Sequence, residues 1–195
     1  MGRRIACFLP FLLLTGFLPC LHATILRSPE GRPLLAALGQ DDRNDPLTED
    51  EVQQIRDNAI HPNERIKLYI KFLGQRLDEI RQLSADPKGD NNRAQIRDKF
   101  EEFTHLCDEL QDNLDTYDSE HADIRKALKD LVAASGKWPD ALKIAPADPN
   151  YDFSRTTALE AAQSAADEAK QLSTEQEVYF QTHKDERHKN GNGPD

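Results

Sequence analysis

One pair of metal-ligand residue types occurs at a spacing that helical metal sites use. Glu102 and His105 form a Glu-x-x-His element, and di-iron bundles use two such elements with two further inward-facing glutamates. This chain has a single copy, and the apolar residues Phe103 and Cys107 mark the inward face of the same predicted helix. Glu102 and His105 flank that face, so we interpret them as weak metal candidates on a solvated surface and predict no bound metal.

Motifs for other chemistry are absent from the sequence. The chain has no Cys-x-x-Cys-His haem attachment motif, no Gly-x-Ser-x-Gly nucleophile motif and no glycine-rich phosphate loop. Cys107 has no histidine placed to act as its base. The acidic run at 49–51 and the pair at 101–102 are typical of helix starts or solvated charge. We therefore expect no cofactor and no enzymatic activity, with an envelope enzyme of unknown reaction as the catalytic alternative.

Residues 137–152 concentrate aromatic and apolar side chains outside any predicted long helix. Three prolines in this segment exclude a long helix, and we predict an ordered strap laid across the helices. Tryptophan and tyrosine are frequent in binding hot spots, so Trp138 and Tyr151 are candidate partner-binding residues. The alternative is that Trp138 closes the end of the core.

The apolar residues of the remaining chain follow the period of packed helices. Between Ile96 and Tyr117 they recur at 4-3-4-3-4-3 spacing without a break, which indicates one seam buried against protein. Cys107 lies on this seam and is predicted to be buried. Thr48 and Glu51 form a capping box at the start of a short helix that ends near Asn58. The predicted long helices cover 63–84, 93–117, 119–136 and 154–182.

These helices predict an all-α fold. The spacing suits an up-down bundle of three to four long helices, with one short helix before them. The junction at 118–119 is so short that its two helices must form a tight hairpin or one kinked rod. The first half of 154–182 is rich in alanine. Because alanine buries little area, that helix either packs very close to a partner or lies at the edge.

Residues 1–23 have the three-part pattern of a secretory signal peptide. Arg3 and Arg4 precede an apolar run at 5–18, and Ala23 offers a small residue before the cleavage point. The run is shorter than the ~20 apolar residues that span a bilayer. The predicted organisation is a cleaved signal peptide (1–23), a flexible leader (24–46), a helical domain (47–182) and a disordered polar tail (183–195).

Charge limits the partners of the mature chain. Residues 1–23 contain two basic and no acidic residues, so the remainder has 23 basic and 35 acidic residues and a formal charge of −12. This balance argues against nucleic acid and against anionic membrane surfaces, which both require basic patches. Membrane attachment is expected only if the uncharged stretch 5–26 remains as an uncleaved anchor. Cys107 is the single cysteine after cleavage, which excludes an intramolecular disulfide.

Two functional hypotheses remain. The first is an exported scaffold or interaction protein, periplasmic or extracellular, that binds a protein partner or itself through a helical face or the 137–152 strap. The second is an envelope bundle that binds a small ligand or a metal. The sequence does not identify a partner or a ligand.

Overall fold

The computed structural model describes residues 45–86, 89 and 91–187. The predicted signal peptide and nearly all of the predicted leader lie outside this range. The prediction of an all-α fold is confirmed, because the described residues form α-helices and one 3-10 turn and contain no strand. None of the described helices combines the length and the apolar character needed to cross a bilayer.

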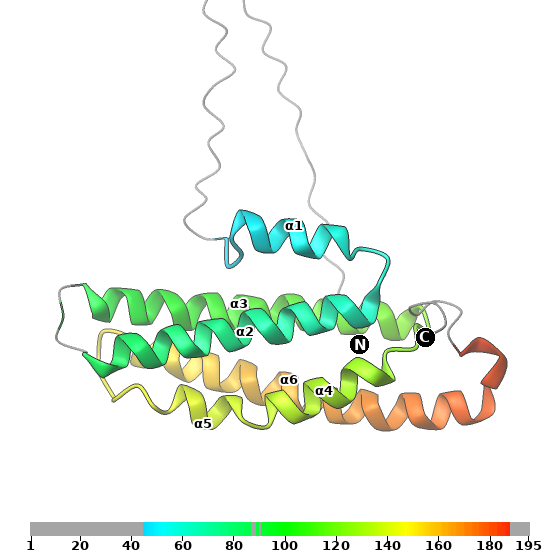
Figure 1. Ribbon diagram of the computed structural model, residues 1–195. Helices are drawn as coiled ribbons and strands as arrows, with labels where there is room; N and C mark the ends of the chain where they lie inside the picture. Colours follow the sequence, from blue (N-terminus) through cyan, green and yellow to red (C-terminus); the bar gives the residue numbers. More distant parts are fainter. Residues whose placement is uncertain (1–44, 87–88, 90, 188–195) are drawn as a thin grey trace, which may run out of the picture. The chain divides into compact units, whose positions relative to one another are not determined.

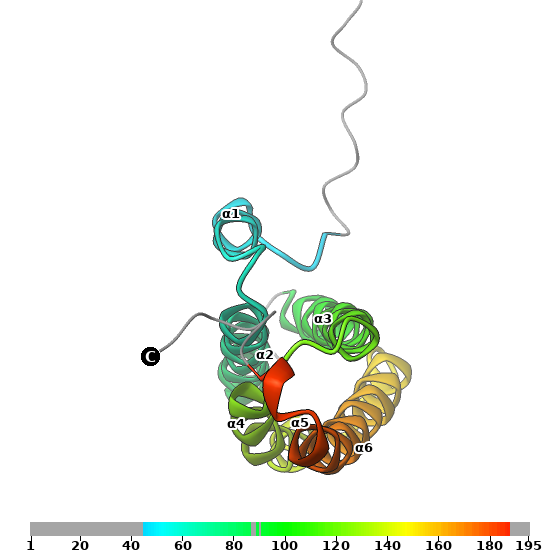
Figure 2. The same cartoon turned by 90° about the vertical axis from the view of Figure 1, so that its right-hand side faces the viewer.

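The helices pack around a common core. Figure 1 shows α2 and α3 side by side and antiparallel, α4 and α5 returning one after the other, and α6 running back along them. Figure 2 looks along these axes and shows α1 outside the ring, beside α2. In chain order the elements are α1 (Glu49–Asp57), α2 (Pro62–Ala85), α3 (Asn92–Ser119), α4 (Arg125–Ser135), α5 (Trp138–Leu142), α6 (Asp152–Thr182) and the 3-10 turn η2 (Lys184–Glu186).

The core contains the seam that the sequence predicts. From Ile96 to Tyr117 each seam residue of α3 is buried, and Cys107 is fully buried as predicted. The alanines of α6 settle the choice between close packing and an edge position. Four of them are fully buried: Ala158, Ala162, Ala165 and Ala169. Their small side chains let α6 lie close to α3 and α4.

The junction between α3 and α4 differs from the prediction. We expected a helix from residue 119, whereas α4 starts at Arg125 and residues 120–124 form a connection. His121 has φ 52, in the left-handed region that breaks a helix. A tight hairpin at 118–119 and a kinked rod are therefore both wrong.

Two buried amides from distant helices hold this connection. Asn63 of α2 donates to the Asp123 carbonyl (2.9 Å) and accepts from the Ala127 backbone N–H (3.1 Å). Gln176 of α6 donates to the Ala122 carbonyl (3.1 Å) and accepts from the Ile124 N–H (3.2 Å). These bonds supply partners for buried backbone groups that a connection between helices leaves unpaired.

The strap at 137–152 contains a short helix and packs against the core. Trp138 opens α5 and keeps 3% of its surface, with its ring edge-on to Phe103 at a centroid distance of 5.8 Å. Tyr151 keeps 1%, and its hydroxyl donates to the Pro146 carbonyl at 2.7 Å. Both side chains thus belong to the core, which is the alternative that the sequence left open for Trp138.

The first residues of the predicted tail make ordered contacts with α6. The Tyr179 ring stacks on His121 and on His183, at centroid distances of 4.7 and 4.1 Å. After η2, Arg187 donates through Nε and Nη2 to the Phe180 carbonyl at 3.0 and 2.7 Å. A basic side chain on a last-turn carbonyl is a common way to end a helix. Residues 188–195 lie outside the described range.

Candidate functional site

The start of α1 is built around one carboxylate. The predicted capping box is confirmed, because the Thr48 side chain accepts from the Glu51 N–H and the Glu51 side chain accepts from the Thr48 N–H (2.8 Å). These bonds pair backbone donors that every helix start leaves open. The same Glu51 side chain faces α2, where it meets a guanidinium.

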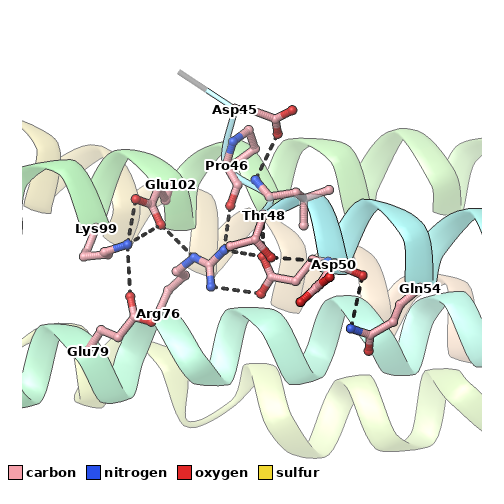
Figure 3. Close-up of polar contacts among 11 residues, drawn as sticks. Asp45, Pro46, Thr48, Asp50, Gln54, Arg76, Glu79, Lys99 and Glu102 are labelled. Carbon is pink, nitrogen blue, oxygen red and sulfur yellow. Dashed lines mark hydrogen bonds and ion pairs between the residues drawn. The ribbon is translucent and has the colours of Figure 1, made fainter. Parts of the chain in front are cut away.

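Arg76 of α2 binds the start of α1 (Figure 3). Its Nη1 donates to Glu51 Oε1 at 3.1 Å and its Nη2 donates to Glu51 Oε2 at 2.7 Å, in the two-pronged geometry that arginine offers a carboxylate. Nη2 also donates to the Pro46 carbonyl at 2.7 Å. On the α3 side, Nε lies 2.7 Å from Glu102 Oε2 as an ion pair without hydrogen-bond geometry. One guanidinium thus joins α1, α2 and α3.

This cluster is shielded from water. Arg76 keeps 4% of its surface and Glu51 keeps 7%. Burial raises the pKa of Glu51, but the hydrogen bonds from Arg76 and from the Thr48 backbone outweigh it and hold the pKa below its ordinary value. Burial lowers the pKa of Arg76, but the bonds to Glu51 together with the negative charges of Glu51, Glu102 and Glu79 outweigh it and hold the pKa above its ordinary value. Both groups are therefore charged at neutral pH.

A second, half-buried cation continues the cluster along α3. Lys99 Nζ lies 3.1 Å from Glu79 Oε2 and 2.8 Å from Glu102 Oε1. Glu102 consequently shares its carboxylate between Arg76 and Lys99, as Figure 3 shows. Burial lowers the pKa of Lys99, and its hydrogen bonds to Glu102 and its ion pair with Glu79 more than compensate. Five charges from three helices therefore form one connected network.

An open groove of about 810 Å³ runs beside this network. One wall is the start of α1 with the flank that carries Val52, Gln53 and Arg56, and the other is formed by α2 and α3. The lining is mainly polar. It consists of residues 45–50, 52, 53 and 56 on the α1 side, with Arg76, Glu79, Lys99 and Glu102 opposite.

The structure separates the two predicted metal candidates. Glu102 belongs to the ion-pair network, and its carboxylate is already bound by two cations. His105 is exposed on α3. Among the described residues, no group of three or more histidine, cysteine, aspartate or glutamate side chains is placed to hold a metal.

Sequence reasoning missed Arg76 and Lys99. It assigned the acidic run at 49–51 to a helix start or to solvated charge, and the run does form the first turn of α1. Glu51, however, is buried. The available signal was its i,i+4 spacing to Ile55, the other buried residue of α1, because residues at this spacing share one helix face. Trp138 and Tyr151 do not line the groove.

Two cations of the groove, Arg76 and Lys99, are paired with carboxylates. The two-pronged geometry of Arg76 suits a planar acceptor, and Glu51 occupies it in this structure. No protein-family model, curated protein or solved structure matches the chain.

Proposed function

We propose that the chain is an exported helical-bundle interaction protein that binds another protein, or a second copy of itself, through the groove beside α1. The observation that supports this most is the attachment of α1. A nine-residue helix lies on the side of the helical domain through a buried Glu51–Arg76 pair, and an open groove remains next to it. Grooves between helices commonly receive a partner's helix or extended segment.

The strap offers a weaker surface for the same function. Its two aromatic candidates, Trp138 and Tyr151, are buried. The large exposed apolar side chains in or next to the strap are Ile144 (51%) and Phe153 (84%), which follows it in α6. Single exposed apolar residues are common on protein surfaces and do not by themselves define an interface. The groove is therefore the first surface to test.

A small-ligand site is the second candidate. The groove volume of about 810 Å³ falls in the range of ~300–1,000 Å³ that ligand sites occupy. Ligand sites are mostly apolar with a few polar groups, whereas this lining is mainly polar and its central cations already have partners. A protein partner, which needs a polar rim around its contacts, fits this lining better.

Site-specific photo-cross-linking in the native cell tests the proposal. A photo-reactive amino acid replaces Gln53 in the groove, Gln163 on the outer side of α6, or Ile144 in the strap. Gln53 and Gln163 are matched, because each is exposed and donates to an aspartate one helical turn on (2.7 and 2.9 Å). We expect a cross-linked protein from position 53 and none from position 163.

Two outcomes would contradict the groove as the interface. Cross-links from position 144 alone would move the interface to the strap. No cross-link from any position, together with a ligand that co-purifies with the protein and is lost on substitution of Arg76, would favour the small-ligand function.

Export is tested on the protein purified from its native cell. Mass spectrometry of the purified protein is expected to find a mature chain that begins at Thr24, directly after the predicted cleavage point. An intact N-terminus in the membrane fraction would replace export of a free protein with anchoring through residues 5–26.

A further inference from the structure

The geometry of α1 points to its partner. We propose that two copies of this chain associate by exchanging α1, so that Glu51 of one copy binds Arg76 of the other. This inference rests on the proposed interaction function and specifies a second copy as the occupant of the α1 position.

Arg76 recognises a short, self-contained segment. Its Nη atoms bind the Pro46 carbonyl and both carboxylate oxygens of Glu51, and these acceptors lie within six consecutive residues of one chain. The capping box within this segment fixes the position of the Glu51 carboxylate. The contact therefore needs a capped helix start that presents Glu51, and it does not need that start to belong to the same copy.

Few other contacts retain α1 in its own copy. Among the nine residues of α1 only Glu51 and Ile55 are buried. Beside them, the Gln54 side chain of α1 accepts one hydrogen bond from Lys71 of α2 (3.1 Å). Ile55, with the partly buried Leu47 just before α1, is a small part of the hydrophobic core, so release of α1 leaves the core of α2 to α6 in place. An exchanged dimer would restore each of these contacts between copies.

The connection between α1 and α2 permits the exchange. Residues 58–61 join the two helices, and α2 starts at Pro62, which fits the first turn of a helix. Ile60 in this connection is 80% exposed. When the connection opens, the two connections of a dimer lie together at the crossing point, where the Ile60 side chains become available to bury each other. Exchange of identical elements is a low-cost route to dimers, since it reuses existing contacts.

Concentration decides between the closed monomer and the exchanged dimer. A short flexible linker gives a tethered segment an effective concentration of about millimolar. The closed form therefore dominates in dilute solution, and exchange increases as the protein concentration approaches that value. This dependence gives the experiment its main variable.

Cross-linking between two variants tests the exchange directly. Gln54→Cys and Lys71→Cys are made separately in the full chain with Cys7→Ser and Cys20→Ser. Cys107 stays, because it is fully buried and burial raises the pKa of its thiol. The two variants are mixed, incubated at increasing concentration and treated with a short bis-maleimide. We expect mixed covalent dimers to exceed dimers of either single variant by about tenfold at near-millimolar protein.

Two controls make the outcome decisive. A chain carrying both Gln54→Cys and Lys71→Cys should cross-link within itself in dilute solution, which shows that the reagent bridges these positions. Arg76→Met is added to the Gln54→Cys variant and Glu51→Ala to the Lys71→Cys variant, so neither closed chain contains the Glu51–Arg76 pair. Only exchange restores that pair, between Glu51 of the first variant and Arg76 of the second. The yield of mixed dimer should therefore rise about tenfold, as expected for a buried charge pair of at least ~1.4 kcal/mol.

The exchange would be overturned if the doubly substituted chain cross-links internally while the mixture gives no mixed dimer at any concentration. It would also be overturned if Arg76→Met in one variant and Glu51→Ala in the other leave the mixed dimer unchanged, because the dimer would then use another surface. Neither result contradicts the proposed interaction function, which is tested separately by the photo-cross-links from position 53. That function fails separately, if position 53 captures neither another protein nor a second copy.

Discussion

At the scale of single residues, Glu51 couples the formation of α1 to its docking. One carboxylate oxygen, Oε2, accepts both from the Thr48 N–H (2.8 Å) and from Arg76 Nη2 (2.7 Å). The bond to Thr48 stabilises the helix start, and the bonds to Arg76 attach that helix to α2. An isolated helix of nine residues is marginal in water. We infer that α1 is helical largely because it is docked, and that loss of the Glu51 charge removes both properties together.

Acid should release α1. Burial raises the pKa of Glu51, but the hydrogen bonds from Arg76 and the Thr48 backbone lower it more, so the pKa lies below its ordinary value of 4.5. A carboxylate with a depressed folded pKa adds stability above its unfolded pKa, and this stability is lost as the pH falls through the folded pKa. Amide hydrogen exchange of residues 49–57, corrected for intrinsic rates, is the measurement. The protection should be constant between about pH 5 and pH 7, and it should decrease when the pH falls below about 4.5.

Glu51→Gln is the control for this titration. The variant should show the same reduced protection of residues 49–57 at neutral and at acid pH, since the titrating group is gone. Global stability is a poorer readout, because burial raises the pKa of Glu109 and its contribution therefore declines as the pH rises. A wild-type α1 whose protection does not change in acid would refute the role of Glu51.

At the scale of elements, side chains from distant helices determine where α4 begins. Asn63 and Gln176 keep 6% and 3% of their surface, and each makes one bond as donor and one as acceptor to the backbone around residues 122–127. Asn63 thereby performs for α4 the task of a capping residue, although it belongs to α2. The connection after α3 depends on these amides for its buried polar groups.

Asn63→Ala should lower the free energy of unfolding by about 1–3 kcal/mol, because it leaves the Ala127 N–H and the Asp123 carbonyl buried without a partner. Urea unfolding followed by far-ultraviolet circular dichroism measures the change. Asn58→Ala is the matched control. Its amide donates to the partly buried Gln54 carbonyl at the end of α1. This bond lies within one helix, and the expected loss is below about 0.5 kcal/mol. Equal losses would show that the connection does not need Asn63.

These cases explain how much the sequence predicts. The seam of α3 and the capping box at Thr48 could be predicted, because each depends on spacings within one helix. The start of α4 could not, since Ser119 is a good local cap and the competing bonds come from residues 52 to 64 positions away. The role of Arg76 could not be predicted for the same reason. Its partner Glu51 is 25 residues distant, and no local pattern links an arginine beside an apolar seam to a carboxylate on another helix.

At the scale of the whole molecule, the described helices divide into a core and an attachment. The hydrophobic core takes its fully buried members from α2 to α6 and their connections, and α1 contributes only Ile55 at 9% exposure. The polar network of Arg76 lies at the boundary between these parts. Core stability and α1 docking should therefore be separable.

A chain that starts at Pro62 should fold cooperatively, with its Arg76 open to solvent where α1 is missing. In the full chain, Arg76→Met should lower the free energy of unfolding by up to about 3–5 kcal/mol, because it leaves Glu51 buried and unpaired. In the shortened chain the same substitution should cost about 0–1 kcal/mol, as expected for an exposed pair. Arg81→Met is the control in both chains, since Arg81 and its partner Asp78 each keep 59% of their side-chain surface. Equal costs of Arg76→Met in the two chains, measured by urea unfolding, would mean that Glu102 rather than Glu51 is the partner that matters and that α1 is not held by this arginine.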